Sequence, residues 1–588
     1  MNILRGLAVS GGIGMGAAYL FTSRPPELKK VRIPEKSIDA EKERLSSTIA
    51  STRKELLGIQ KKISASLGTE FADFLEVQIQ TLSDPALLSV CNRNIRESYS
   101  AEYAFSKAVY EIAKPLLDAT GGLFKERLAD IEDVTNRVLR NLLSLPSVSI
   151  IDVPENSVVV AHSIPPSEIV LLDPKKVNGL AAEIGGRTSH IAIIAKALEI
   201  PAVLGVEHLL DKLKFDEITV VDAQRGQVVL APTERRKQMY LQEIKDFRKR
   251  RKSLITKSPP QTVLTKDEHK LDVSANIELT SEIYALERYG ADGVGLFRTE
   301  YLFLTKRRFP SEEEQYRIYS EAAMQLKPHP LIIRTLDIGG DKVFPGYEEA
   351  NPFLGWRAIR FLFDNEEIFL DQLRAILRAS AHGNVKIMFP MISSVSETRF
   401  ARRLLASAQE QLKDRGQRYD PEMEVGIMVE IPSAALLADR LAEHVDFFSI
   451  GTNDLTQYTL AVDRGNEKIS ELFSHYHPAV LQLIRRVIGA GHKAHIWVGV
   501  CGEMAAEPLG IALLVGLGAD ELSMTPCAVP VACKIIREVR VDELRKIASK
   551  ALEYITPTDV VRYLRRKLSR TFPSLSRIFL EKKNVCYL

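Results

Sequence analysis

Eight short apolar runs recur beyond residue 260 of this 588-residue chain, and helix-forming stretches separate them. The runs are Leu271–Ile277, Gly293–Phe297, Leu331–Leu336, Val385–Met391, Val425–Val429, Asp446–Ile450, Ile496–Val500 and Glu521–Met524. Buried strands that alternate with helices form parallel sheets, and eight such units close into a (β/α)8 barrel. We therefore predict a TIM-type barrel over residues 261–555.

The predicted barrel carries polar side chains at or just past the ends of its strands. Barrels of this kind place their chemistry on the loops that follow the strands. The residues in question are Arg298, Arg334, Glu430, Asn453, Asp454, Arg464 and Cys501. An arginine at a strand end is more often a salt-bridge partner, and a cysteine there is usually a small buried hydrophobe. Because random placement would scatter them over both ends, their grouping at one end predicts a site.

The chemistry of these side chains converges on one kind of ligand. The three arginines offer planar forks for a phosphate and a carboxylate. Glu430 and Asp454 are hard oxygen donors of the kind that Mg²⁺ accepts. Asn453 adds a donor for a phosphate oxygen, and Cys501 is an acid in the same mouth. The set predicts a site for a small phospho-carboxylate with a metal and a proton donor.

Two further positions in the barrel are secondary candidates. Arg357 lies in the run Gly355-Trp356-Arg357-Ala358-Ile359-Arg360, and Lys342 ends the run Asp337-Ile338-Gly339-Gly340-Asp341-Lys342. Substrate contact and a structural salt bridge are equally consistent with either residue.

A histidine motif lies in the N-terminal half of the chain. His190 ends the run Gly185-Gly186-Arg187-Thr188-Ser189-His190, between predicted strands and before a helix-forming stretch. The glycine pair ends one element, and Thr188 and Ser189 are good helix caps. A helix N-terminus has free N–H groups and a partial positive charge, which suit an anion. We interpret His190 as a residue that receives phosphate. The alternative is a capping histidine with no chemistry.

The remaining patterns divide the chain into further parts. The pattern of apolar residues predicts an α/β domain that combines residues 1–22 and 147–230, with one or two strands before residue 22. Residues 23–146 predict an all-helical insert, and residues 231–260 a charged linker helix with Ser258-Pro259-Pro260 at its end. The later strands predicted for the α/β domain are Ser149–Val153, Ser157–Ala161, Val177–Ala182 and Glu217–Val221. The helices predicted for the insert are Glu70–Leu82, Tyr103–Leu117 and Leu123–Leu143.

Composition and charge exclude several classes of protein. A net charge of +3 gives no overall field for nucleic acid, and no aromatic side chains interleave the basic run at residues 245–252. No apolar run is long enough to span a bilayer. Glycines interrupt the apolar residues 6–22, which argues against a secretory signal peptide there. The five cysteines are scattered without a CxxC pair, which favours a reducing cytoplasm.

Several of these motifs together resemble one family. They are Gly-Gly-Arg-Thr-Ser-His (185–190), Gly-Leu-Phe-Arg-Thr-Glu (295–300), Asp-Ile-Gly-Gly-Asp-Lys (337–342), Asn351-Pro352 with Gly-Trp-Arg-Ala-Ile-Arg (355–360), and Ser-Ile-Gly-Thr-Asn-Asp-Leu-Thr-Gln-Tyr (449–458). Over nearly its whole length the chain is similar to the phosphoenolpyruvate–protein phosphotransferases, the enzyme I family of the bacterial sugar phosphotransferase system.

The resemblance implies a two-step reaction. Phosphoenolpyruvate would bind with Mg²⁺ in the barrel and phosphorylate His190 on a swivelling domain, and His190 would then phosphorylate a histidine of the carrier protein HPr. It assigns the proton donor to Cys501 and the metal to Glu430 and Asp454. The substrate residues that it implies are Arg298, Arg334, Asn453, Asp454 and Arg464. It also implies release of pyruvate and a homodimer through the barrel.

The same resemblance suggests a docking site for HPr and marks two departures. HPr would dock on acidic residues of the helical insert: Glu70, Asp73, Glu76, Asp84, Glu126, Asp130, Glu132 and Asp133. A solvated acidic face is the alternative for each of them. Lys196 stands where many relatives have arginine. The basic stretch 556–588 is longer than expected and is open to three interpretations: a disordered tail, an extra docking helix or a modified dimer edge.

Three other hypotheses about function have less support in the sequence. A pyruvate-phosphate dikinase or phosphoenolpyruvate synthase relative needs a nucleotide-grasping domain, and no such segment is visible before the helical insert. The nitrogen-regulatory branch of the family usually carries an N-terminal sensory domain, which is not seen either. A non-catalytic docking protein would be expected to lose His190, Cys501 or a metal carboxylate, and all are present.

Overall fold

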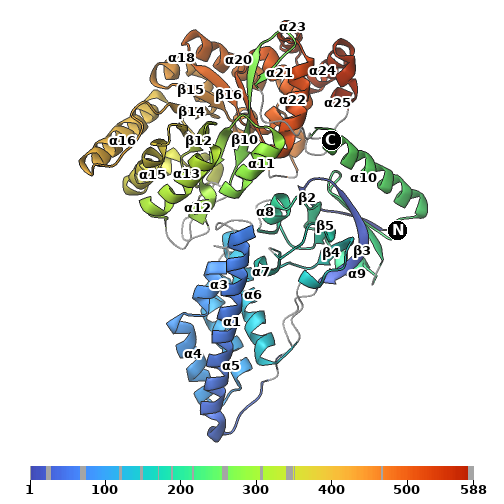
Figure 1. The fold of residues 1–588 in the computed structure, drawn as a ribbon, viewed down its shortest axis with the longest axis vertical. Helices are drawn as coiled ribbons and strands as arrows, with labels where there is room; N and C mark the ends of the chain where they lie inside the picture. The colour runs from blue at the N-terminus through green and yellow to red at the C-terminus, as the bar shows by residue number, and fades with distance from the viewer. Residues whose placement is uncertain are drawn as a thin grey trace. The chain divides into compact units, whose positions relative to one another are not determined.

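The protein divides into two compact units, residues 1–249 and the residues from 250 onward. The structure is a computed structural model (Figure 1). It describes residues 2–21, 28, 30–66, 75–117, 122–145, 150–169, 171–186, 190–214, 217–254, 262–304, 309–339, 349, 351–464, 466 and 468–580. No helix in these ranges is both long and apolar enough to cross a membrane.

The first unit contains an eight-stranded mixed sheet in the order β1-β8-β7-β3-β4-β5-β6-β2. Its strands are β1 Asn2–Arg5, β2 Leu7–Ser10, β3 Ile13–Phe21, β4 Ser157–Ala161, β5 Val177–Ala182, β6 Ala202–Leu204, β7 Ile218–Asp222 and β8 Gln227–Leu230. The central strands β3, β4, β5 and β6 pair in parallel, and the outer pairs are antiparallel. Residues 1–22 therefore supply three strands, not one or two.

The strand predicted at Ser149–Val153 is wrong. Residues Ile150–Asp152 form a 3-10 helix. The N–H of Ile150 donates to the Glu168 carboxylate at 2.9 Å, and the N–H of Val153 donates back to the Ile150 carbonyl at 3.3 Å. Because these partners already satisfy the backbone groups, the apolar run does not join the sheet.

The glycines near the N-terminus do not all lie in a turn. Gly12 has φ of +108° in the turn before β3, but Gly14 and Gly16 lie inside that strand. A Cβ added at Gly14 would lie 1.8 Å from the Asn178 carbonyl oxygen, and one at Gly16 would lie 1.9 Å from that of Asn156. These two glycines thus allow β3 to pass close to the backbone of β5 and of the residue before β4.

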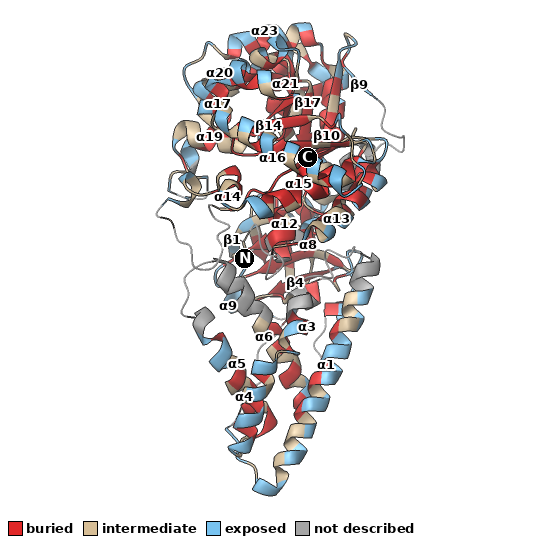
Figure 2. Cartoon of the chain, turned by 90° about the vertical axis from the view of Figure 1, so that its left-hand side faces the viewer, coloured by how far each residue is buried: buried red, intermediate tan, exposed pale blue. Residues whose placement is uncertain are grey.

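The helical insert predicted between β3 and β4 is confirmed. It contains α1 Ile38–Ser66, α3 Glu76–Thr81, α4 Pro85–Arg96, α5 Ala101–Leu117 and α6 Gly122–Leu142. Leu56, Ile95, Phe105 and Val138 are fully or almost fully buried among these helices. Figure 2 shows exposed residues along the outer faces of α1 and α4. Of the predicted helix Glu70–Leu82, residues 70–74 lie outside the described part.

Helix α10, Glu234–Leu254, confirms the predicted charged helix, and its first half packs on the sheet. Tyr240 is buried in a cluster with Ile13, Val220 and Val229. Arg225, in the turn after β7, pairs with Glu243 at 3.0 Å. This part of α10 therefore belongs to the first unit. Ser258-Pro259-Pro260 lies outside the described residues.

The second unit is a closed barrel of eight parallel strands, as predicted. They are β10 Lys270–Ile277, β11 Val294–Arg298, β12 Leu331–Arg334, β13 Val385–Phe389, β14 Val425–Val429, β15 Phe447–Ile450, β16 Trp497–Val500 and β17 Glu521–Met524. Each strand pairs with the next, and β10 pairs with both β17 and β11, so the sheet closes. The short β9, Val263–Leu264, runs antiparallel to β10.

Helices surround this barrel. They are α11 Ile283–Tyr289, α12 Glu300–Leu304, α13 Glu312–Leu326, α14 Ile359–Asp364, α15 Glu366–Ser380, α16 Val395–Asp414, α17 Pro432–Leu436, α18 Ala438–Leu441, α19 Thr452–Leu460, α20 Pro478–Lys493, α21 Pro508–Leu517, α22 Val529–Glu538 and α23 Val541–Ala551. Serine caps with a reciprocal glutamate begin α13 and α16, at Ser311 and Ser394.

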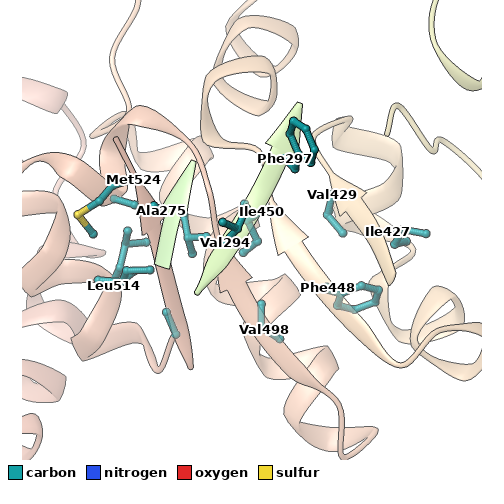
Figure 3. Packing of buried hydrophobic residues seen from close by; sticks show 14 of the residues in the cluster. Ala275, Val294, Phe297, Ile427, Val429, Phe448, Ile450, Val498, Leu514 and Met524 are labelled. Atoms are coloured by element: carbon teal, nitrogen blue, oxygen red, sulfur yellow. The ribbon is translucent and has the colours of Figure 1, made fainter. Parts of the chain in front are cut away.

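The barrel has two hydrophobic layers because side chains alternate along each strand. Val294, Ile427, Phe448 and Val498 belong to the large cluster between strands and helices (Figure 3). A separate cluster fills the interior and contains Leu296, Ile332, Met388, Met428, Phe447 and Cys501. The apolar floor of the barrel therefore lies directly below the polar strand ends.

The basic C-terminal stretch forms two helices that belong to the barrel. Helices α24 Pro557–Thr571 and α25 Ser576–Leu580 contribute buried side chains to the barrel core. These are Val560, Leu564, Leu568, Phe572, Leu575 and Phe579. Of the three interpretations left open by the sequence, a disordered tail is therefore wrong for residues 557–580. Residues 581–588 lie outside the described part.

Candidate active site

The C-terminal ends of the barrel strands carry most of the candidate residues. Arg298 ends β11 and Arg334 ends β12. Glu430 follows β14 by one residue, and Cys501 follows β16 by one residue. Asn453 and Asp454 lie in the first turn of α19, directly after β15. The strand order thus brings these residues to one mouth of the barrel.

Arg334 is held rigidly by buried acidic partners. Its Nη2 donates to Glu300 Oε1 at 2.7 Å, and its Nη1 lies 3.3 Å from Asp337 Oδ2. Burial alone would lower the pKa of this guanidinium, but Glu300, Asp337 and Glu430 raise the pKa above its ordinary value. Arg334 therefore supplies a permanent positive charge in a site that excludes water.

Arg357 extends this network to the helix that follows β15. It donates from Nε and Nη2 to the two oxygens of Asp337, at 2.8 and 2.9 Å. Its Nη2 also lies 3.4 Å from Asp454 Oδ2, and its Nη1 donates to the Tyr458 hydroxyl at 3.0 Å. Of the two alternatives for Arg357, the salt bridge is therefore observed, and contact with substrate stays a prediction. Lys342 lies outside the described residues.

Gly339 allows the loop after β12 to approach Arg357. Its φ is +118°, and an added Cβ would lie 2.7 Å from the Cα of Arg357. A side chain there would collide with backbone and also strain the conformation. The first glycine of the Gly-Gly pair in this motif thus has a clear structural reason.

Glu430 is an almost fully buried carboxyl group beside other acids. Its Oε1 accepts the Met391 N–H at 2.7 Å. Burial, Asp454 and Asp337 raise the pKa of Glu430 to about 8. An added Cβ at Gly451 would lie 2.9 Å from the Glu430 Cβ, so that glycine makes room for this side chain. Like charges gathered in a buried place are stabilised by a cation.

The two carboxylates fit a Mg²⁺ ion that also binds substrate. Within the described ranges, no group of three or more His, Cys, Asp or Glu side chains is arranged to hold a metal. Mg²⁺, however, is usually bound by one or two carboxylates together with substrate phosphate oxygens and waters. Glu430 and Asp454, with their mutual repulsion, match that donor set.

Cys501 is a buried thiol whose backbone is fixed. Its N–H donates to the Ile450 carbonyl at 3.1 Å, and its own carbonyl accepts from Asn276 Nδ2 at 2.9 Å. Ser523 in turn holds Asn276 through a 2.6 Å hydrogen bond. Burial is the main reason that the pKa of Cys501 rises to about 11. The thiol thus keeps its proton at neutral pH and can act as an acid.

Arg298 and Asn453 also lie at the mouth of the barrel, whereas Arg464 is not linked to the other arginines. Arg298 donates to Glu278 Oε1 at 2.8 Å and remains partly exposed. Asn453 and Glu503 exchange two hydrogen bonds, at 3.0 and 3.4 Å. Arg464 lies exposed in the loop after α19, where its backbone N–H donates to Gln457 Oε1 at 3.3 Å. The structure does not bring Arg464 into the network of the other arginines.

His190 begins α8, His190–Ala197, as predicted. Residues 187–189 and the His190 side chain lie outside the described part. Ser10 Oγ donates to the Ala195 carbonyl at 3.2 Å and ties α8 to β2. Gly185, before the motif, has φ of +139°. His190 belongs to the first unit, while all the barrel candidates belong to the second.

Several residues of the mouth were missed by sequence reasoning. Glu300 and Asp337 hold Arg334 and Arg357 in place. Because both side chains are acidic, they were not predicted at a site for an anion. Their motifs, Arg298-Thr299-Glu300 and the run that starts at Asp337, were recognised. A signal was therefore present, since each acid follows an arginine candidate by two or three residues.

This arrangement defines a class of protein: a TIM barrel with buried arginines and carboxylates at the C-terminal ends of its strands. Family models agree with that class. The model described as "PEP-utilising enzyme, PEP-binding domain" matches residues 252–541. Those described as "PEP-utilising enzyme, N-terminal" and "PEP-utilising enzyme, mobile domain" match residues 5–127 and 153–226.

Relatives narrow the class to one family. A phosphoenolpyruvate-protein phosphotransferase of Listeria innocua is 40% identical over 564 residues, which cover 95% of this chain and 98% of the relative. One of Haemophilus influenzae is 39% identical over 565 residues, with the same coverage. A solution structure titled "Enzyme I (nEIt)" is 31% identical over 42% of this chain, with a TM-score of 0.37. The chain belongs to the phosphoenolpyruvate-protein phosphotransferase family.

Proposed function

We propose that this enzyme transfers the phosphoryl group of phosphoenolpyruvate to His190 and from there to a histidine of HPr. Membership of the family supports the reaction. The observation that carries the residue assignments is the linked network at the mouth, in which Arg334 and Arg357 share Asp337 and Arg357 reaches Asp454. Positioning and neutralisation of spreading negative charge provide most of the catalysis in phosphoryl transfer.

In the first step, a ring nitrogen of His190 attacks the phosphorus atom. The bond between phosphorus and the enol oxygen breaks, and its electron pair stays on the enolate of pyruvate. Arg298 and Arg334 hold the anionic groups of the substrate, and Asn453 donates to a phosphate oxygen. Mg²⁺ bound by Glu430 and Asp454 neutralises charge when it is present. We propose that Arg464, in the loop after α19, also contacts the substrate.

In the second half of this step, the Cys501 thiol protonates the methylene carbon of the enolate and releases pyruvate. The thiolate then recovers a proton from water. The buried thiol suits this role because its raised pKa keeps it protonated before the reaction. A histidine of HPr finally attacks the phosphohistidine and leaves His190 free for another cycle.

The relay requires His190 to meet the barrel and then HPr. We therefore propose that residues 1–22 and 147–230 swivel as a body and that residues 231–260 link them to the barrel. Motions of whole domains are common steps in such enzymes. The packing of the first half of α10 on the sheet supports a pivot after it, near the C-terminal end of that helix.

HPr is proposed to dock on the helical insert, residues 23–146. Two of the acidic candidates already have structural roles. Asp133 is buried and accepts from Gln78 Nε2 at 2.8 Å, and Asp84 caps α4 by accepting the Ala86 N–H at 2.8 Å. The side chains of Glu70, Asp73, Glu76, Glu126 and Asp130 lie outside the described residues. Glu132 is exposed and remains a candidate.

The setting of the reaction follows from the family. We propose that the enzyme acts in the cytoplasm as the first step of sugar transport, as a homodimer through the barrel, and without contact to nucleic acid or membrane.

The test is phosphorylation by labelled phosphoenolpyruvate with Mg²⁺. Wild-type protein is expected to take up acid-labile, base-stable label that purified HPr removes, whereas His190→Ala takes up none. Arg334→Met is expected to fold but to label at least 100-fold more slowly, because the buried cation is lost. Label on His190→Ala, or none on folded wild type, would overturn the proposal.

A further inference from the structure

A basic groove lies in the second unit, away from the strand ends. It has a volume of about 1110 Å³ and runs between helix α24 and the segment 460–477 that follows α19. This is slightly larger than the roughly 300–1,000 Å³ of most pockets that bind small molecules. None of the residues proposed for phosphoenolpyruvate, the metal or the proton donor lines this groove.

Four arginines of α24 line the groove: Arg562, Arg565, Arg566 and Arg570. Among the described residues that line it, Glu471 is the one acidic side chain. Arg562 has an exposed partner in Asp559 at 2.9 Å. In the part of the chain that the structure describes, the other three arginines have no ion-pair partner, and Arg565 Nε is buried without a hydrogen bond.

The spacing of these arginines leaves repulsion that an anion would relieve. Arg562, Arg566 and Arg570 stand four residues apart, so they lie on one face of α24. Like charges at this spacing destabilise a helix. Asp559 already offsets Arg562, so a multiply charged anion in the groove would neutralise Arg566 and Arg570 together with the neighbouring Arg565, and guanidinium forks suit phosphate oxygens.

The rest of the lining is apolar. Leu460, Val462, Leu472, Phe473, Val561 and Leu580 contribute to it. Leu472 and Leu580 are 63% and 55% exposed, so hydrocarbon surface faces solvent here. A bare inorganic ion would leave this surface uncovered, whereas a phosphorylated molecule with a ring would cover it.

We propose that this groove binds a small metabolite that combines two or more phosphate groups with a flat ring, of which a nucleoside diphosphate is an example. The phosphates would contact Arg565, Arg566 and Arg570, and the ring would lie against Phe473 and Leu472. This binding does not rest on the proposed function.

The groove also connects physically to the barrel mouth. Helix α19 carries Asn453 and Asp454 in its first turn and ends at Leu460, which lines the groove. Arg464 lies in the loop between Val462 and the other groove residues from Glu471 onward. A ligand there would restrain this loop and thereby change how Arg464 reaches substrate. This second part of the inference rests on the proposed function.

The test is titration calorimetry of the full chain with ADP, inorganic pyrophosphate and adenosine at 150 mM KCl. ADP is expected to bind more tightly than pyrophosphate, and adenosine more weakly than either. The double variant R566A/R570A should weaken ADP at least 10-fold. Leu472→Ser should weaken ADP but leave pyrophosphate unchanged. R545A/K546A, two exposed basic residues of α23 outside the groove, is the matched control and should bind as wild type.

Three outcomes would overturn the inference. The first is that folded wild type does not bind ADP. The second is that R566A/R570A binds ADP as tightly as wild type, and the third is that all ADP binding is lost when KCl is raised from 50 to 150 mM. A shift of oligomeric state in R566A/R570A by sedimentation, without nucleotide binding, would instead make the groove an interface between copies. The coupling is tested separately: ADP should change the KM for phosphoenolpyruvate at least twofold in wild type and not in R566A/R570A.

Discussion

Asp337 and Arg357 face each other through two parallel hydrogen bonds of 2.8 and 2.9 Å. Asp337 follows β12 and Arg357 precedes α14, so this fork joins two parts of one long connection. The same aspartate lies 3.3 Å from Arg334, and the same arginine lies 3.4 Å from Asp454. The pair therefore links the predicted substrate arginine to a predicted metal ligand.

Asp337→Asn should destabilise the barrel and slow phosphorylation. Removing one partner of a buried ion pair leaves the other charge uncompensated, and this typically costs about 3–5 kcal/mol. We expect a lower barrel melting temperature by calorimetry and at least 100-fold slower labelling of His190. Glu443→Gln, which breaks the exposed pair with Arg440, is the control and should change neither. Unchanged stability in Asp337→Asn would contradict the importance of this pair.

Cys501 should react slowly with alkylating reagents. Burial is the main cause that raises the pKa of this thiol to about 11, so at pH 8 roughly one molecule in 1000 carries the thiolate, against about a quarter for an ordinary thiol. Alkylation by iodoacetamide, followed at the Cys501 peptide by mass spectrometry, should be at least 100-fold slower than for free cysteine. The rate should still rise above pH 10. A plateau below pH 9 would show a lower pKa.

The role of Cys501 as an acid has its own test. Cys501→Ala should lower the rate of pyruvate formation by roughly 10²–10⁴-fold, the usual contribution of a general acid. Binding of phosphoenolpyruvate, measured separately by calorimetry, should change little, because the arginines remain. Equal losses of binding and rate would point to a purely structural thiol.

Glu521→Gln should stabilise the barrel at pH 8 but not at pH 5. Glu521 is buried inside the barrel, in space left by Gly295 and Gly499, and its Oε2 has no hydrogen-bond partner among the described residues. Burial raises the pKa of this carboxyl from 4.5 to about 7. The folded state then holds its proton more tightly than the unfolded state. Stability is therefore lost as the pH rises between these values, by about 3 kcal/mol in total.

Melting temperatures of wild type and Glu521→Gln at pH 5 and pH 8 would measure this effect. The melting temperature of Glu521→Gln relative to that of wild type should be higher at pH 8 than at pH 5. Glu422→Gln, on the surface, should show no such trend. A difference that does not depend on pH would mean that Glu521 is ionised throughout.

Leu564→Ala should destabilise the barrel although it lies in the C-terminal extension. Leu564 is fully buried in the barrel core, and large-to-small changes at such sites typically cost about 2–5 kcal/mol. Lys567→Ala, exposed on the same helix, should stay within about 0.5 kcal/mol of wild type. Equal stability of the two variants would show that α24 does not support the barrel.

Periodicity alone located the barrel strands to within two residues. Runs such as Val425–Val429 and Glu521–Met524 match β14 and β17 at both ends. Fully buried strands appear in a sequence as continuous apolar runs, whereas the helices between them show the helical period. The two kinds of element can therefore be told apart. The same reasoning failed at Ser149–Val153, where a side chain distant in sequence, Glu168, occupies the backbone N–H that a strand would use.

The barrel, the helical insert and the residues that end the strands could all be predicted from the amino-acid sequence, because each of these follows from local periodicity and chemistry. Which charges meet became apparent only in the folded chain. Glu300 and Arg334 are 34 residues apart in the chain, and Arg357 and Asp454 are 97 apart, yet each pair lies within ion-pair distance. Spacing along the chain carries no trace of such contacts, since they depend on the closure of the barrel. For the same reason the burial of Glu430, Cys501 and the basic C-terminal helix became visible only in the folded molecule.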